Sequence, residues 1–183
     1  MDLLESLKEK AKHKKKRIVL PEGNSERTLK AAHIILKEDI ADIILLGDAN
    51  EIYSLSNKSG LDLRKATIIN PKYPPFRETY INKFMELRKA KGINREEAEN
   101  ILKQEIYYAP MMIYMGDADG EVSGAEHTTA DTVRPALQIV RTSPGISVVS
   151  GAMVMITKRK DLGHNGIFIF ASFDIVLPFL LLT

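Results

Sequence analysis

Residues 17–46 contain the pattern that decides the fold. They read RIVL (17–20), then PEGNSERTLKAAHIILKEDIA (21–41), then DIILL (42–46). The first and last stretches are continuous apolar runs, which are typical of strands buried on both faces of a parallel sheet. The stretch between them has capping residues followed by apolar residues three and four apart, and this spacing predicts a helix. The segment is therefore a predicted strand–helix–strand unit.

The same alternation continues on both sides of this unit. Residues at helical spacing predict an amphipathic first helix: Leu3, Leu4, Leu7 and Ala11. After the second strand, Asp48 can cap another helix, and ATII (66–69) predicts a third strand. Crossovers between parallel strands are right-handed in nearly all cases. The order therefore predicts an α/β fold, namely a three-layer α/β/α domain with a mainly parallel sheet.

A proline-rich connection, PKYPPF (71–76), follows the third strand. Aromatic and apolar residues three or four apart then predict a long helix. Arg88 comes four residues after Phe84, so it is expected at the edge of the apolar stripe of that helix. The KGIN stretch (91–94) ends the helix, and residues 95–115 predict one or two more.

We expect two domains. Residues 1–145 form the α/β/α domain, and residues 146–183 begin a second, incomplete domain that ends in an atypical apolar tail from about residue 172. Residues 166–182 approach the length of a membrane helix, but a carboxylate and a proline interrupt them. The preferred interpretation is one buried strand followed by a tail, with no membrane span.

The composition excludes several classes of site. The net charge is +2 and hydrophobic residues make up 44% of the chain, as in a soluble globular protein without a nucleic-acid signature. There is no cysteine, so disulfides, thiolate metal ligands and a cysteine nucleophile are excluded. The first residues lack the apolar centre of a signal peptide. The basic run Lys12–Arg17 is interpreted as a solvated helix end rather than a nucleic-acid patch.

The segment most suited to chemistry is GDADGEVSGAEHTTADTVRPALQIVRTSPG (116–145). Small residues dominate positions 120–125 and let backbone N–H groups approach a ligand. Thr128, Thr129 and Asp131 are suited to capping the start of the helix that follows. Because a helix amino terminus carries free N–H groups, this segment predicts a site for an anion such as phosphate.

Pro135 falls inside the helical pattern, where its ring would clash with the carbonyl of Asp131. We therefore expect the helix to start or kink there, which places Arg134 at a backbone break with its planar fork available to a phosphate. Arg134 paired with Asp131 or Asp117 in a structural network is the alternative. Residue types alone leave both interpretations open.

Metal and nucleotide sites are not predicted. Asp117 and Asp119 lack the spacing and the final glutamate of a calcium loop. His127 lies near Glu126 and Asp131, but a lone histidine without a second one at ligand spacing is usually not a ligand. The sequence has no Walker A loop and no GxGxxG motif.

Four stretches together resemble the phosphate acetyltransferases and, more distantly, the phosphate butyryltransferases. They are IVLPEGNSERTLKAA (18–32), ADIILLG (41–47), FMELRKAKG (84–92) and ADGEVSGAEHTTADTVRPALQIVRT (118–142). The resemblance extends to about Ala171. It implies transfer of an acetyl group between acetyl phosphate and coenzyme A, an α/β/α two-domain fold, a cytoplasmic location and usually a homodimer. Coenzyme A is then a substrate, and no metal or other cofactor is implied.

The resemblance also implies roles for particular residues. Arg88 and Arg134 would line the active-site cleft and contact acetyl phosphate and coenzyme A, with Ser123, Thr128 and Thr129 as neighbours. The family's catalytic serine, arginine and aspartate belong to a carboxy-terminal segment that these 183 residues do not contain. No catalytic residue is therefore expected among these residues, and Asp131 and His127 are the less favoured candidates for a base.

Two hypotheses of different class follow. One is an acyltransferase; the other is a non-catalytic fragment that keeps phosphate and coenzyme A contacts but lacks the base. Under the second hypothesis, the purified chain gives no steady turnover in a thiol-coupled assay.

Overall fold

The computed structural model describes residues 3–146 and 149–172. Contacts divide the chain into two compact units, Met1–Val140 and Arg141–Thr183. The sequence placed a domain boundary after residue 145.

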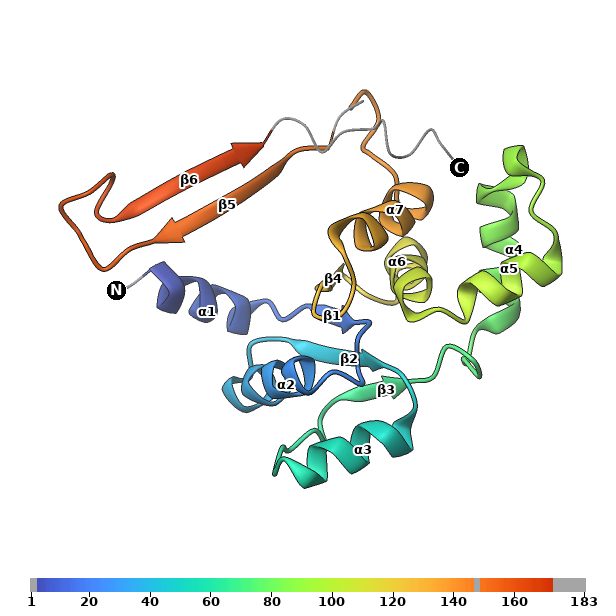
Figure 1. Ribbon diagram of the computed structural model, residues 1–183, viewed down its shortest axis with the longest axis horizontal. Coiled ribbons are helices and arrows are strands. Elements are labelled where there is room, and N and C mark those ends of the chain that lie inside the picture. Colours follow the sequence, from blue (N-terminus) through green and yellow to red (C-terminus); the bar gives the residue numbers. More distant parts are fainter. Residues whose placement is uncertain (1–2, 147–148, 173–183) are drawn as a thin grey trace. The chain divides into compact units, whose positions relative to one another are not determined.

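A four-stranded sheet forms the centre of the first unit (Figure 1). Its strands are β1 (Arg17–Leu20), β2 (Asp42–Leu46), β3 (Thr67–Ile69) and β4 (Gly120–Glu121). They lie in the order β3-β2-β1-β4, and each neighbouring pair is parallel. The predicted mainly parallel sheet is confirmed, and the three predicted strands match the observed ones to within one residue.

Side chains of the central strands alternate between two cores, as the pleat of a strand requires. Val19, Ile44 and Leu46 join one apolar cluster, whereas Leu20, Ile43 and Leu45 join the other. Because both faces of the sheet are covered, the unit has the predicted three α/β/α layers.

Helices supply the outer layers. The helices of the unit are α1 (Leu3–His13), α2 (Glu26–Glu38), α3 (Ala49–Lys58), α4 (Arg77–Leu87), α5 (Arg95–Leu102), α6 (Glu105–Met115) and α7 (Thr129–Ile139), with a short 3₁₀ helix at Lys89–Lys91, and α2 to α7 form the layers. In Figure 1, α2 and α3 lie on one side of the sheet and α4 to α7 on the other. Residues of α2 and α3 pack in one apolar cluster and residues of α4 to α7 in the other.

Local sequence explains where several of these helices begin. Asp48 caps α3 by accepting the N–H groups of Asn50 and Glu51. Asn94 and Glu97 form a reciprocal capping box at α5. Gly92 ends the preceding turn with a φ of 69°, a left-handed conformation that glycine adopts without strain.

We expected a helix to start or kink at Pro135, and the first of these two alternatives is wrong. The helix α7 begins at Thr129 and runs through Pro135 to Ile139, so Arg134 lies inside a helix rather than at a break. Pro135 and Ile139 are buried, and α7 packs against α6. Tertiary packing therefore outweighs the hydrogen bond that the proline removes.

The second unit contains an antiparallel hairpin. Strand β5 (Gly151–Ile156) pairs with β6 (Ile167–Ser172) in a register that joins Met153 to Phe170 and Val154 to Ile169. The expected buried strand is a strand, but it is not buried, because Ile169 is 71% and Phe170 54% exposed. The tail was predicted from about residue 172, and its residues 173–183 lie outside the described residues. Within the described part of the chain, no helix is both long and apolar enough to cross a membrane.

Candidate functional site

The candidate site lies where the order of strands reverses. The chain runs from β1 outward to β2 and β3, then returns to place β4 on the opposite side of β1. In open parallel sheets, ligands bind at the carboxyl ends of the strands beside such a reversal. Two loops meet at this point: residues 21–25 after β1 and residues 122–128 after β4.

Glu22 joins these two loops. Its side chain is only 3% exposed, and its carboxylate accepts the backbone N–H groups of Gly124, Ala125, Glu126 and His127 at 2.7–3.0 Å. Burial alone would favour the protonated form. The N–H groups of Glu126 and Ala125 and the His127 ring outweigh this effect and lower the pKa of Glu22 to about 2. Glu22 is therefore an internal anion bound by the loop.

This arrangement corrects the expectation for the small-residue turn. The sequence predicted that its backbone N–H groups approach a phosphate, but those of residues 124–127 bind Glu22 instead. The start of α2 also holds the loop, because the Ser25 hydroxyl donates to Glu126 at 2.7 Å and the Arg27 guanidinium donates to the carbonyl of Ala125. The turn is thus a fixed part of the scaffold.

Close packing fixes the loop after β1 as well. The N–H of Gly23 donates to the carbonyl of Leu46 at 3.1 Å. A Cβ atom on Gly23 would lie 2.3 Å from that same oxygen, so only glycine fits at this position of the loop.

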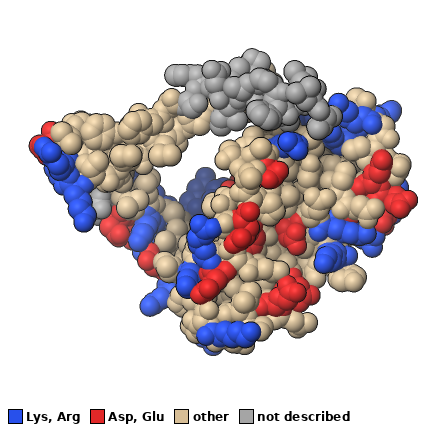
Figure 2. Space-filling view, in the orientation of Figure 1, with Lys and Arg blue, Asp and Glu red and all other residues tan. Residues whose placement is uncertain are grey.

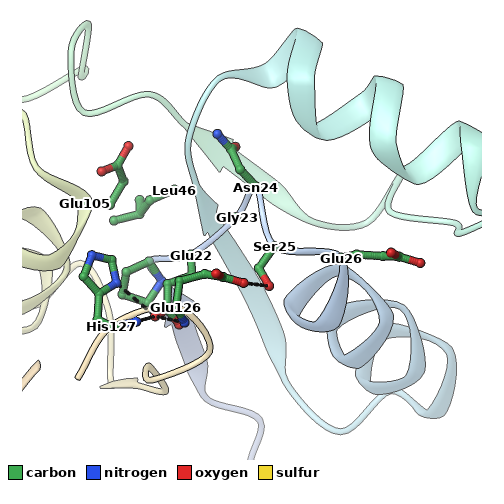
Figure 3. Close-up of a pocket in the computed structure, with 10 residues that line it drawn as sticks. Glu22, Gly23, Asn24, Ser25, Glu26, Leu46, Glu105, Glu126 and His127 are labelled. Atoms are coloured by element: carbon green, nitrogen blue, oxygen red, sulfur yellow. Dashed lines mark hydrogen bonds and ion pairs between the residues drawn. The ribbon is translucent and has the colours of Figure 1, made fainter. Parts of the chain in front are cut away.

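His127 completes the contact with Glu22. Its Nδ1 lies 2.9 Å from Glu22 Oε1, and its side chain is 38% exposed. A crevice of about 420 Å³ opens beside the pair. Its lining residues are Pro21, Glu22, Gly23, Asn24, Ser25, Glu26, Leu46, Glu105, Glu126 and His127. Figure 3 shows the His127 ring and Glu105 at one end of this crevice and Asn24 and Glu26 at the other.

A second carboxyl lies next to this site on β4. Glu121 pairs in register with Val19, so both side chains point to the sheet face covered by α4 to α7. Its Oε1 is buried and has no hydrogen-bond partner among the described residues. Burial, reinforced by the charge of Glu22, raises the pKa of Glu121 to about 7.

Of the predicted residues, Ser123 and Thr128 lie on the loop that joins β4 to α7, and Thr129 is the first residue of α7. Ser123 is half-buried, and its hydroxyl has no partner within the described residues. Thr128 is the N-cap of α7: its hydroxyl accepts the N–H of Asp131 and donates to the Asp131 carboxylate at 2.6 Å. Thr129 is exposed at the first position of the helix. The predicted helix cap is confirmed for Thr128. Its hydroxyl is engaged in hydrogen bonds with Asp131.

The two predicted arginines lie on helices that pack together. Arg88 is the C-cap of α4, Arg134 lies inside α7, and α4 contacts α7. Both side chains are half-buried, and neither forms an ion pair within the described ranges. The Arg88 Nε is buried and has no hydrogen-bond partner in the part of the chain that the structure describes. None of the five predicted binding residues lines the crevice beside His127: its lining contains neither arginine, and it contains none of Ser123, Thr128 and Thr129.

The charge of Arg134 acts on a nearby carboxylate. The pKa of Asp131 is lowered mainly by the Thr128 hydroxyl, with a smaller contribution from Arg134. Asp117, the other carboxylate considered for Arg134, accepts the hydroxyl of Tyr80. On the face drawn in Figure 2, acidic and basic side chains are interspersed.

Sequence reasoning missed Glu22 and Glu121. Glu22 comes two residues after a predicted parallel strand, and that position was the available signal, since the carboxyl ends of such strands carry sites. Glu121 gave no signal, because β4 has only two residues. No group of three or more His, Cys, Asp or Glu residues suited to a metal ion occurs in the described part of the chain.

The fold and the site place the chain in the class of doubly wound α/β/α domains. In this class, polar groups on loops gather where the order of the strands reverses. The sequence pattern of the family described as "Phosphate acetyl/butaryl transferase" matches residues 2–177. The chain belongs to this family.

Individual proteins that resemble the chain are phosphate acetyltransferases, in agreement with the matched family. The chain is 51% identical over 172 residues to the phosphate acetyltransferase of Thermoanaerobacterium thermosaccharolyticum and 46% identical over 172 residues to that of Clostridium acetobutylicum. Each match covers 94% of this chain and 52% of the relative. A similar solved structure is a phosphotransacetylase from Streptococcus pyogenes, with a TM-score of 0.83 and 37% identity over 92% of this chain and 51% of that one. Another is the EutD phosphotransacetylase from Staphylococcus aureus, with a TM-score of 0.80 and 40% identity over 92% of this chain and 49% of that one. The chain thus spans about half the length of each of these four proteins.

Proposed function

We propose that this chain is the amino-terminal half of a phosphate acetyltransferase, which transfers an acetyl group between acetyl phosphate and the thiol of coenzyme A. Family membership supports the reaction class. The observation that carries the proposal for this half concerns Arg88, whose buried Nε has no hydrogen-bond partner among residues 3–146 and 149–172. An unsatisfied buried donor on a cation is expected to have a ligand, and a phosphoryl oxygen fits it.

Arg88 and Arg134 are suited to the phosphate side of this reaction. Acetyl phosphate carries its charge on the phosphoryl group, and that charge stays with the phosphate when the acetyl group leaves. Cations placed beside it stabilise both the bound substrate and the leaving group. Because α4 packs on α7, the two arginines belong to one helical layer. In this proposal the other half of the longer relatives supplies the base that removes the thiol proton.

Replacing either arginine is expected to weaken phosphate binding. Loss of one charged hydrogen bond corresponds to about 1.5–3 kcal/mol. Arg88→Ala and Arg134→Ala should therefore each raise the Kd for inorganic phosphate by roughly 10- to 150-fold. Isothermal titration of the purified chain with phosphate measures this directly.

Arg64→Ala is the matched control, because Arg64 is an exposed arginine that pairs with Asp62 at 2.6 Å. It should bind phosphate as the unmodified chain does. Equal phosphate affinity in all three variants would contradict the assignment of Arg88 and Arg134. A hybrid that joins residues 1–171 to the remainder of the Thermoanaerobacterium relative extends the test to turnover, where Arg134→Ala should reduce the use of acetyl phosphate.

A further inference from the structure

Two carboxyl groups from neighbouring strands meet at the start of one loop. Glu22 lies two residues after β1, and Glu121 is the last residue of β4, the parallel neighbour of β1. The loop of residues 122–127 begins directly after Glu121, and its backbone N–H groups at residues 124–127 bind Glu22. This loop is a clasp: it holds one carboxyl and follows the other directly in sequence.

The Glu121 end of the clasp lacks hydrogen bonds. Within residues 3–146 and 149–172, neither Glu121 Oε1 nor Ser123 Oγ has a hydrogen-bond partner, and both atoms are buried. A neutral carboxyl tolerates such a position better than a carboxylate does, because a charge removed from water needs donors around it. The N–H groups of residues 124–127 already bind Glu22. The closed clasp therefore leaves an ionised Glu121 without these donors.

Gly124 is suited to act as the hinge of the clasp. Pairing with β1 extends to Val122, whose N–H donates to the carbonyl of Val19 at 3.1 Å. Gly124 has a φ of 103°, which glycine adopts without strain. Beyond its chain neighbours, no described atom lies within 4 Å of the place where a Cβ on Gly124 would be. The backbone can therefore turn at Gly124 while β4 stays paired.

Glu22 is the charged residue that acts on Glu121. The pKa of Glu121 is raised first by burial and then by the Glu22 carboxylate. Within the clasp, Glu126 accepts the Ser25 hydroxyl and His127 contacts Glu22. Other ionisable side chains on the surrounding elements include Arg17 on β1, Arg27 on α2, Glu105 and Tyr108 on α6, Asp117 before β4 and Asp131 on α7. Loss of the Glu121 proton therefore sets two carboxylates against each other at the clasp.

We propose that the clasp is a pH-dependent switch, which opens more often once Glu121 is ionised. Opening at Gly124 admits water to Glu121 and Ser123, so the two buried oxygens gain hydrogen bonds and the repulsion between the carboxylates is weakened. Neither a substrate nor the other half of the longer relatives takes part in this switch, so it goes beyond the proposed acetyl transfer.

The sign of the pH dependence follows from the two environments of Glu121. In the closed clasp its pKa is raised from 4.5 to about 7, and in an open, hydrated clasp it returns toward 4.5. The closed form binds more protons between these pH values, so opening becomes easier from about pH 4.5 to 7 and levels off above 7. This difference limits the gain in the opening equilibrium to roughly 300-fold. Glu22, whose pKa is about 2 when bound, stays ionised in both forms above about pH 5.

Hydrogen exchange of the clasp amides tests the switch in the 183-residue chain. Between pH 5 and pH 8, the protection factors of residues 124–127 should fall by at least about tenfold, and in Glu121→Gln they should stay constant. The N–H groups of Asn50 and Glu51 are an internal control, because they bind the Asp48 carboxylate in the cap of α3 and should keep their protection. Constant protection of the clasp in the unmodified chain, or an equal fall in Glu121→Gln, would overturn the proposal.

His127 has to be separated from Glu121, since it also contacts Glu22 and histidine is the other side-chain type that titrates near neutral pH. Loss of a proton from its ring would weaken the clasp in the same direction. His127→Asn keeps a side-chain donor but does not titrate, so protection should still fall with rising pH in this variant. If the fall disappears in His127→Asn and persists in Glu121→Gln, the switch is His127 and the proposal is wrong.

A measurement on the unmodified chain covers the case in which a variant does not fold. ¹³C NMR of the Glu121 carboxyl carbon should give a titration midpoint near pH 7, and the amide resonances of residues 124–127 should shift with the same midpoint. A Glu121 midpoint near pH 4.5, or clasp amides that do not follow it, would refute the switch. Phosphate and coenzyme A are absent from all of these samples, so the outcome is independent of the proposed function.

Discussion

Glu22→Gln is expected to lower the free energy of unfolding of the first unit by about 3 kcal/mol at pH 7, because a pKa lowered from 4.5 to about 2 corresponds to a difference of that size. The carboxylate accepts four backbone N–H groups and the His127 ring. An amide keeps one oxygen, but its NH₂ group would face donors that then have no acceptor.

The effect has a defined pH dependence. Because the pKa of Glu22 is lowered on folding, its stabilisation is complete above about pH 4.5 and is lost as the pH falls toward 2. The difference between the unmodified chain and Glu22→Gln should therefore shrink on acidification. Urea unfolding at several pH values, followed by circular dichroism, measures it.

Glu26→Gln is the matched control. Glu26 lies four residues along the same segment, and its ion pair with Lys30 is exposed. Exposed pairs contribute little to stability, so this variant should unfold nearly as the unmodified chain does. Equal stabilities of Glu22→Gln and Glu26→Gln would show that the bonds to Glu22 do not stabilise the fold.

Glu121→Gln is expected to have the opposite effect. Burial and the charge of Glu22 raise the pKa of Glu121 from 4.5 to about 7. Between these two pH values the folded chain therefore holds a proton that the unfolded chain has released. The stability of the unmodified chain should fall as the pH rises from about 4.5 to 7, because the folded state binds more protons over that range. Glutamine removes this penalty. At pH 8 the variant should be more stable by roughly 3 kcal/mol.

The pH 4 measurement provides the internal control for Glu121→Gln. A protonated carboxyl and an amide are both neutral and similar in size, so the two chains should have nearly equal stabilities there. A constant difference between pH 4 and pH 8 would contradict the raised pKa of Glu121.

The two carboxyls are coupled, which gives a further check. The charge of Glu22 contributes to the raised pKa of Glu121. In a Glu22→Gln background, the midpoint of the Glu121 titration should therefore move to lower pH. A double-mutant cycle over the same pH range measures this coupling.

The sequence by itself determined the layers of the first unit. The continuous apolar runs at 17–20 and 42–46 and the capped helix between them report local periodicity and burial on both faces, which do not depend on distant contacts. The same applies to the caps Asp48 and Thr128, since each cap acts within one turn of its own helix. The motifs that resemble the family are likewise continuous stretches of sequence, so they can be recognised without the fold. The family that they predicted is confirmed by the match over residues 2–177.

Only the tertiary structure decided what the turn after β4 binds. Gly124 and Glu22 are 102 residues apart, and they meet because β4 returns beside β1. Residue types showed that the turn could bind an anion, but not that the chain supplies its own. Packing also decided that α7 continues through Pro135, because buried contacts with α6 offset a local penalty. Local patterns fix elements, whereas the partners of buried polar groups depend on which strands become neighbours.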